Sequence, residues 1–174
     1  MSDQVRDIAS SLHSRLVPSG ASRHGLVVGI DRYLDSRLDL ECAAADAQLV
    51  HRLMVDPECG LFPEDNVELL LNEAATQQAV WRSLASLRRK AGPEDTVWVY
   101  FAGHAAPEDD QTYWVTHDSD VNDLFSTGLG SEQISSVLSR VAVDRQVVLL
   151  DCCHAAAVAC QQDPTRSVLA AEEL

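Results

Sequence analysis

Long apolar runs, metal-binding cysteine spacings and an excess of positive charge are all missing from this sequence of 174 residues. The opening segment, MSDQVRDIASSLHSRLVPSG, contains no apolar stretch long enough for a signal peptide or a membrane helix. We therefore expect a cytoplasmic protein that does not bind a membrane.

The cysteines do not follow the pattern of a disulfide framework or of a zinc site. There are 5 of them, no C-x-x-C occurs, and the adjacent Cys152 and Cys153 cannot easily bridge each other. A zinc or redox protein would therefore lack its ligand spacing. Reduced thiols in a reducing compartment fit this pattern best.

Positive charge is scarce, because 13 Lys and Arg stand against 27 Asp and Glu, for a formal net charge of −14. Such a surface repels nucleic acid and attracts basic partners or basic peptide segments. No internal repeat, low-complexity tract or linker divides the chain, and its length suits one domain with a core. We expect an N-terminal helical extension at residues 1–20 and one domain at residues 21–174.

Apolar runs alternate with helical patterns along the chain. Buried strands are predicted at residues 24–30, 66–71, 95–103 and 145–151, and a short hairpin arm at 111–118. Helices are predicted at residues 42–55, 76–92 and 130–142, with Thr76 as the N-cap of the second and Gly130 or Ser131 as that of the third. This alternation predicts an α/β fold, with a mostly parallel sheet covered by helices on both faces.

Reactive side chains follow two of these strands at their carboxyl ends, where α/β folds place their sites. His104 follows the strand that ends in YFAG, and Cys152 and Cys153 follow the strand that ends in VVLLD. A cysteine is a weak nucleophile at its free pKa of about 8.5, and a nearby histidine takes its proton and later protonates a leaving amine. The alternative is a strand-end histidine with small core cysteines, but the position of both at strands predicted to be central favours a catalytic pair.

Side-chain alternation along the last strand distinguishes the two cysteines. Successive residues point to opposite faces, so Asp151 and Cys153 share one face while Leu150 and Cys152 share the other. Leu150 indicates a packed environment for Cys152, which leaves Cys153 as the predicted nucleophile. A turn at Asp151 would break this alternation.

The segment VWVYFAGHA, followed in a later strand by VVLLDCCHA, resembles the two catalytic motifs of the caspase-like cysteine peptidases, in particular their bacterial and metacaspase branch. HGLVVGIDRYLDSRLDLECAAADAQLV is similar to that family's first strand, loop and helix, and YWVTHDSDVND to its Tyr-Leu-Leu-Pro-x-Asp-x-Asp segment. The resemblance covers residues 24–160. It implies a caspase-like three-layer sandwich.

The resemblance implies a cysteine endopeptidase in which His104 is the catalytic histidine and Cys153 the nucleophile, in agreement with the alternation. It also implies an oxyanion hole formed by the backbone N–H groups of Ala105 and Cys153. The family's roles suggest activation by processing or by a partner, in bacterial stress, cell-death or anti-phage signalling.

Two carboxylates match the aspartates of the metacaspase specificity pocket. They are Asp151, two residues before the cysteine, and Asp46, in the first helix; Ala102 is assigned to the substrate-binding residues with them. Two carboxylates in one cleft imply a protein or peptide substrate with Arg or Lys before the cleaved bond. The alternatives are a strand-end cap for Asp151 and an exposed helix residue for Asp46.

The sequence also departs from the family pattern. Ala105 replaces the glycine after the catalytic histidine, CHAA replaces CHSG after the nucleophile, and the pocket cysteine expected at Ala43 is displaced to Cys42. These changes leave open a caspase-like pseudo-peptidase that acts as an interaction module. The presence of the histidine, the cysteine and both aspartates favours the active enzyme.

An acidic stretch follows the predicted histidine strand. It contains Glu108, Asp109, Asp110, Asp118, Asp120 and Asp123. Some metacaspases bind calcium in comparable loops, but no EF-hand spacing occurs here. A solvated acidic loop without a cofactor is the preferred interpretation, with Ca²⁺ as the alternative.

The caspase-like fold has more core strands than the four predicted here. We therefore expect the sequence to be the large-subunit portion of that fold without its last strands, either as a processed or truncated chain or as one that a second chain completes. We expect a small-subunit fragment or a partner chain to complete the sheet, because the apolar edge would otherwise be open to pairing.

Overall fold

The computed structural model describes residues 21–60 and 62–154, with the backbone alone at residues 153 and 154. The helix predicted within residues 1–20 lies outside the described residues. The strands are β1 (Arg23–Gly29), β2 (Val67–Leu71), β3 (Thr96–Glu108), β4 (Gln111–Trp114), β5 (Leu129–Gly130) and β6 (Arg145–His154). The helices are α2 (Ala43–Val55), α3 (Gln77–Lys90), α4 (Leu124–Thr127) and α5 (Ser131–Leu138), with short 3-10 turns at Ser36–Leu38, Glu64–Asn66 and Asn72–Ala74.

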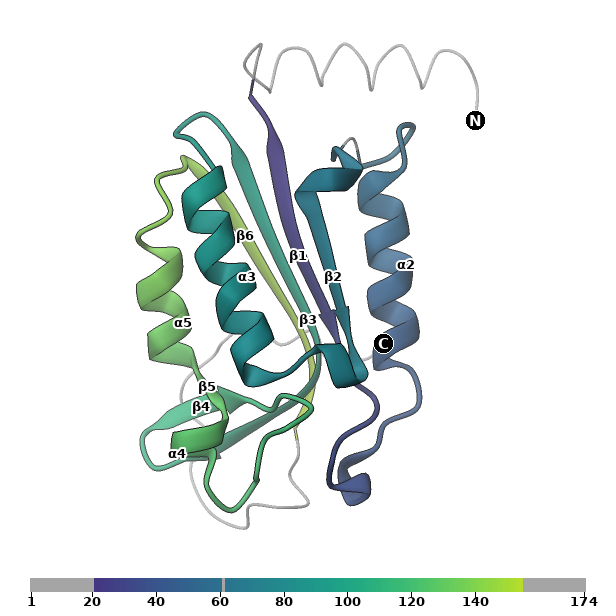
Figure 1. The fold of residues 1–174 in the computed structure, drawn as a ribbon, viewed down its shortest axis with the longest axis vertical. Coiled ribbons are helices and arrows are strands. Elements are labelled where there is room, and N and C mark those ends of the chain that lie inside the picture. The colour runs from purple at the N-terminus through teal and green to yellow at the C-terminus, as the bar shows by residue number, and fades with distance from the viewer. Residues whose placement is uncertain (1–20, 61, 155–174) are drawn as a thin grey trace.

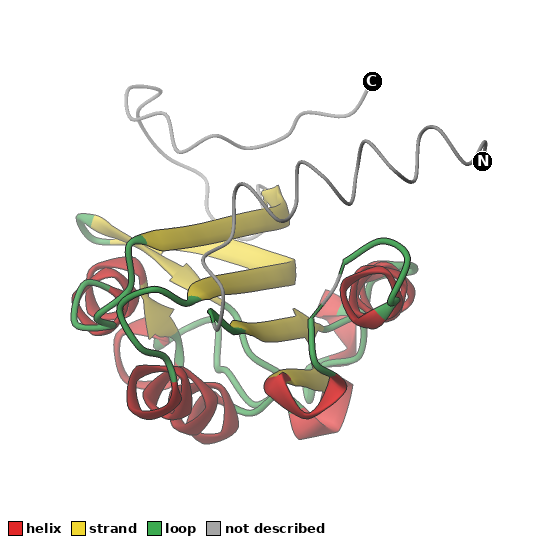
Figure 2. Cartoon of the chain, turned by 90° about the horizontal axis from the view of Figure 1, so that it is seen from above, coloured by secondary structure: helices red, strands yellow, loops and turns green. Residues whose placement is uncertain are grey.

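The strands form one mixed sheet in the order β2-β1-β3-β4-β5, and β6 pairs with the other edge of β3. The pairs β1–β2, β1–β3 and β3–β6 are parallel, whereas β4 and β5 extend the sheet with antiparallel pairs. Helix α2 covers one face of the sheet, and α3 and α5 cover the other (Figures 1 and 2). The predicted fold class, a three-layer sandwich around a mostly parallel sheet, is confirmed.

Alternation along β3 explains why the sheet is covered on both faces. Val97, Val99 and Phe101 pack in the larger core cluster, whose other members include Val80 and Leu84 of α3 and Ile134 and Leu138 of α5. The intervening residues Tyr100 and Ala102 pack in a second cluster, with Val27 of β1 and with Ala43 and Ala47 of α2. A central strand with apolar side chains on both of its faces can be buried only between two layers of helices.

The two predicted helix starts are confirmed. The Thr76 hydroxyl caps α3 by accepting a hydrogen bond from the N–H of Ala79 at 3.2 Å. Gly130 precedes α5, which ends at Leu138 rather than at residue 142. The carbonyl of Leu138 accepts from the N–H of Val141 at 3.0 Å and from the side-chain amide of Gln146 at 3.1 Å, and the second bond ties the helix end to β6.

The predicted ends of β3 and β6 are both too early. β6 runs to His154 and not to residue 151. β3 continues past Gly103 to Glu108, because its last residues pair with β4 from Ala105↔Trp114 to Glu108↔Gln111. His104 therefore lies within a strand and not in the loop after it. The predicted hairpin arm is confirmed as β4, which ends at Trp114, and the short β5 was not predicted.

A carboxylate just before β3 ties the start of β1 to the turn that follows α3. Asp95 accepts hydrogen bonds from the N–H of Ser22 at 2.6 Å and from that of Gly92 at 2.8 Å, and its Oδ2 lies 3.3 Å from Nε2 of His24. Burial acts to raise the pKa of Asp95, but the hydrogen bonds from Gly92, Ser22 and His24 outweigh it and lower the pKa.

We expect Asp95→Asn to lower the free energy of unfolding at pH 7 by about 1–2 kcal/mol, because an amide accepts these bonds more weakly. A depressed pKa means that the stabilisation is present above the unfolded value of about 3.9 and is lost as the pH falls through the folded value. Urea unfolding from pH 7 to pH 2.5 should therefore show the difference shrink on acidification. The exposed Asp65→Asn is the control; an equal effect of both substitutions would contradict the prediction.

Candidate active site

The predicted catalytic residues lie in register across the β3–β6 pair. The register aligns His104 with Cys153, Gly103 with Cys152, and Ala102 with Asp151. Residues in register on parallel strands share a face of the sheet. The structure thus places the backbone position of Cys153 beside His104, at the carboxyl ends of two central strands.

His104 is held so that one ring nitrogen stays available. Its side chain is buried, and Nε2 lies 2.8 Å from the carbonyl oxygen of Leu38. A carbonyl only accepts, so Nε2 carries the hydrogen and the lone pair of the neutral imidazole is on Nδ1. Nδ1 is buried and makes no hydrogen bond within the described part of the chain. Nδ1 is therefore the ring nitrogen that can accept a proton.

Tyr33 contacts His104 from the loop after β1. Its hydroxyl oxygen accepts a hydrogen bond from the N–H of His104 at 3.0 Å, and the two ring centroids lie 5.3 Å apart. A Cβ at position 103 would lie 2.9 Å from the Tyr33 hydroxyl and would force it to shift, so glycine at this position favours the contact. Neither Tyr33 nor the Leu38 carbonyl is predicted from the sequence as part of the site. The signal that points to them is their place in the loop of the family-like first segment.

Strand β6 stays extended through both cysteines, with no turn at Asp151. The alternation that places the two cysteines on opposite faces therefore continues to Cys153. Leu150 and Cys152 pack together against the larger core cluster on the α3 and α5 side. The packed environment predicted for Cys152 is confirmed. The alternate positions of the strand belong to Asp151 and Cys153, and the side chain of Cys153 lies outside the described residues.

The two predicted pocket carboxylates act on one phenol. The Tyr100 hydroxyl donates to Oδ2 of Asp151 at 3.0 Å. Burial raises the pKa of Tyr100, and the negative charges of Asp151 and Asp46 raise it further. Asp46 and Asp151 are both exposed, and the buried Ala102 pairs with Asp151 in the sheet. Both carboxylates are thus close enough to affect the same hydroxyl group.

The amide of Ala105, assigned to the oxyanion hole, faces β6. The carbonyls of Ala102 and His104 accept from Ile30 and Val115, which lie on the opposite edge of β3. Backbone groups of successive strand residues point alternately to the two edges. The N–H of Ala105 is therefore directed toward the strand that carries Cys153, while its catalytic role stays a prediction.

A family model described as a caspase domain matches residues 22–173. This chain belongs to the caspase domain family. The family is one of cysteine peptidases, which agrees with a thiol and an imidazole on adjacent strands. Assignment to the metacaspase branch stays a prediction.

The fold of this caspase domain is also found in solved structures. The crystal structure of a Geobacter sulfurreducens protein matches 76% of this chain with 20% sequence identity and a TM-score of 0.60. The match spans 51% of that protein, so the chain corresponds to about half of its length. No curated protein matches the chain. None of the helices among residues 21–60 and 62–154 has the length and apolarity needed to cross a membrane.

Several acidic residues of the caspase domain accept hydrogen bonds from backbone N–H groups of loops and helix starts. Asp118 accepts from the N–H of Gln77 at 2.8 Å, and Asp123 caps α4 by accepting from Ser126 at 3.2 Å. Hydrogen bonds from Asn122 lower the pKa of Asp120. In the part of the chain that the structure describes, no group of three or more His, Cys, Asp or Glu residues is arranged to hold a metal ion.

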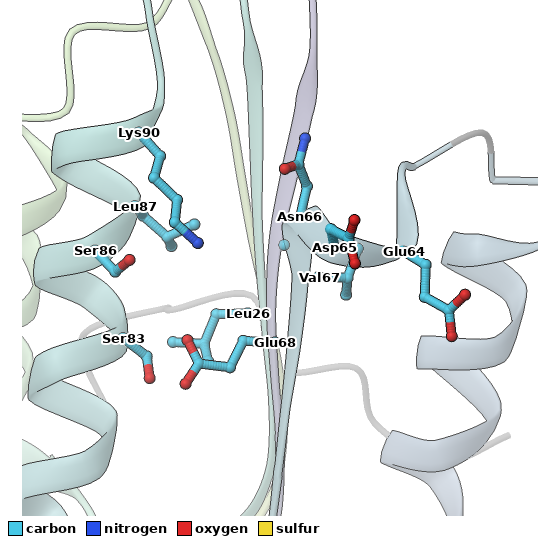
Figure 3. A pocket seen from close by; sticks show the side chains of 11 residues that line it. Leu26, Glu64, Asp65, Asn66, Val67, Glu68, Ser83, Ser86, Leu87 and Lys90 are labelled. Atoms are coloured by element: carbon cyan, nitrogen blue, oxygen red, sulfur yellow. The ribbon is translucent and has the colours of Figure 1, made fainter.

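A hollow between β2 and α3 lies at the opposite end of the sheet from His104. Its lining includes Ser83, Ser86 and Lys90 of α3, and Asn66 and Glu68 beside and on β2 (Figure 3). It is at the amino ends of β1 and β2, whereas His104 lies beyond their carboxyl ends. None of the predicted site residues lines this hollow.

We expect iodoacetamide to modify Cys153 faster than Cys152 at neutral pH, because only Cys153 aligns with His104. Peptide mass spectrometry after brief labelling measures both sites. Cys153→Ala should abolish hydrolysis of fluorogenic peptides, while Cys152→Ala should leave most of it and lower the midpoint of thermal unfolding by removing packed volume. Substitution of the exposed Cys59 by Ser is the matched control. Preferential labelling of Cys152 would overturn the assignment.

Proposed function

We propose that this caspase domain is a cysteine endopeptidase that cleaves peptide bonds after Arg or Lys, with His104 and Cys153 as its Cys–His dyad. The observation that carries the proposal is the alignment of Cys153 with a histidine whose Nε2 is fixed on the Leu38 carbonyl. That contact selects the tautomer in which Nδ1 accepts a proton, as activation of a thiol requires.

The proposed reaction has two stages. Nδ1 of His104 takes the thiol proton of Cys153, and the sulfur attacks the peptide carbonyl. The negative oxygen of the tetrahedral intermediate is stabilised by the N–H groups of Ala105 and Cys153. Collapse breaks the C–N bond, His104 returns the proton to the leaving amine, and a thioester remains. Water, deprotonated by His104, then hydrolyses the thioester and restores the thiol.

The preference for a basic residue is proposed from Asp151 and Asp46. A guanidinium pairs with a carboxylate through two parallel hydrogen bonds and gains a further contact from a second carboxylate. The charge effect of both aspartates on Tyr100 supports a shared negative region. The net charge of −14 favours approach of a basic segment and disfavours nucleic acid.

A second proposal concerns completion of the sheet. Within the described residues β6 pairs only with β3, and Val148 and Leu149 are 40% and 43% exposed. An apolar strand with an open edge is a template for pairing with another chain. We propose that a small-subunit fragment or a partner chain pairs with β6, and that processing or partner binding activates the enzyme in cytoplasmic stress, cell-death or anti-phage signalling of a bacterium.

The alternative is a caspase-like pseudo-peptidase that serves as an interaction module. Ala105 in place of glycine and the open edge of β6 favour it. It predicts association through β6 without turnover of any peptide. The experiments below distinguish the two functions, because one measures turnover and the other measures association.

A fluorogenic peptide panel with Arg, Lys, Asp or Leu before the cleaved bond tests specificity. We expect Arg and Lys peptides to be cleaved, and Asp151→Asn to reduce kcat/KM for the Arg peptide by at least about tenfold, equivalent to about 1.4 kcal/mol. Asp144→Asn, an exposed position just before β6, is the matched control, and parallel assays with and without calcium test the Ca²⁺ alternative. A preference for Asp in the wild type, or an unchanged Arg preference in Asp151→Asn, would contradict the proposal.

The chain alone should be poorly active and should associate, with a downstream fragment or with a second copy. Sedimentation over a range of concentrations measures this association. Leu149→Glu should weaken it by placing a charge on the exposed face of β6, whereas Phe125→Glu, at a more exposed apolar residue of α4, should not. A stable monomer with full turnover would refute this prediction.

A further inference from the structure

Strand β1 ends too early to accept a hydrogen bond from the backbone N–H of His104. The β1–β3 pairing ends at Gly29↔Ala102, and the last bond between them runs from the N–H of Ile30 to the Ala102 carbonyl at 3.0 Å. His104 is the next residue of β3 whose backbone faces that edge. Its N–H would be a buried donor without an acceptor if nothing replaced β1, and such donors are rare in folded proteins.

The Tyr33 hydroxyl fills this gap between the two strands. It accepts from the N–H of His104 at 3.0 Å and donates to the carbonyl of Ile30 at 3.2 Å. Both Tyr33 and His104 are buried, and the tyrosine ring lies beside the imidazole with an interplanar angle of 38°. The side chain thus continues the β1–β3 hydrogen bonding past the end of β1.

The same loop holds the other side of the histidine. The N–H of Tyr33 donates to Oδ1 of Asp39 at 3.0 Å, and the N–H of Leu40 donates to the Asp31 carbonyl at 3.0 Å. These bonds fix the loop that carries the Leu38 carbonyl, the partner of His104 Nε2. His104 is therefore restrained by one loop at its backbone, at its ring face and at Nε2.

We propose that Tyr33 is a positioning residue for His104. Its hydroxyl fixes the backbone of His104, and its ring limits the rotation of the imidazole, so that Nδ1 stays available beside β6. The inference rests on the proposed function, since it adds a residue to the Cys–His dyad. Tyr33 touches neither thiol nor substrate in this mechanism and acts only through the histidine.

Tyr33→Phe removes the hydroxyl and keeps the ring. We expect kcat for an Arg peptide to fall about tenfold with KM nearly unchanged, because misplacement of a catalytic group reduces kcat. Tyr113→Phe is the matched control, because Tyr113 is a buried tyrosine of β4 that pairs with Ala106. Thermal unfolding of both variants separates a loss of stability from a loss of positioning.

A second readout does not depend on turnover. The pH dependence of Cys153 alkylation reports the imidazole beside it, and the exposed Cys59 of the same molecule gives the profile of an ordinary thiol. We expect Cys153 in the wild type to react at lower pH than Cys59, and Tyr33→Phe to move its profile toward that of Cys59. Tyr113→Phe should leave it in place.

The outcomes separate this inference from the proposed function. If wild-type Cys153 and Cys59 have the same profile, the dyad proposal fails, and ¹⁵N spectra of the His104 ring then decide the role of Tyr33. A ring tautomer and titration that change in Tyr33→Phe and not in Tyr113→Phe support positioning. Unchanged kinetics, alkylation and ring spectra in a folded Tyr33→Phe protein would show that Tyr33 is only a core residue.

Discussion

The parallel pairing of β3 with β6 is the constraint on which the candidate site depends. Its register sets which residue lies beside His104, and a shift by one position would move Cys152 there and turn every side chain of β6 to the opposite face. Burial opposes such a shift. Leu150 and Cys152 pack in the larger core cluster, while the polar Asp151 bonds to Tyr100 on the other face. The packing of the core thus determines the alignment of His104 with Cys153.

Satisfaction of buried polar groups shapes the surroundings of His104. A buried imidazole requires partners, and the loop after β1 supplies a carbonyl for Nε2 and a hydroxyl for the backbone N–H. Nδ1 alone has none within the described residues. This asymmetry orients the ring, because the two nitrogens of a neutral imidazole have opposite hydrogen-bonding roles.

The negative charge near Asp151 has a structural basis of its own. The Tyr100 phenol, with its pKa raised by burial and by the nearby carboxylates, stays a neutral donor at physiological pH and holds Asp151 through its Oδ2. The second carboxylate, Asp46, is carried by α2, whose position follows from the packing of Ala43 and Ala47 on the sheet. A helix and a strand that are far apart in sequence thereby each place a carboxylate where its charge raises the pKa of the same phenol.

Local patterns in the sequence determined much of this arrangement. Apolar runs and helical periodicity predicted the parallel strands, the three main helices and the layer architecture, and alternation along one strand was enough to separate Cys152 from Cys153. These features follow from the geometry of a single element, so a short stretch of sequence contains them.

The end of β3 was misplaced because it depends on pairing with β4. The contacts of His104 could not be foreseen, since Leu38 and Tyr33 lie 66 and 71 positions away and one of them acts through a backbone carbonyl that any residue would supply. Only the tertiary structure brings these groups together, because they meet through the end of β1 and the turn of the following loop and not through a repeating pattern.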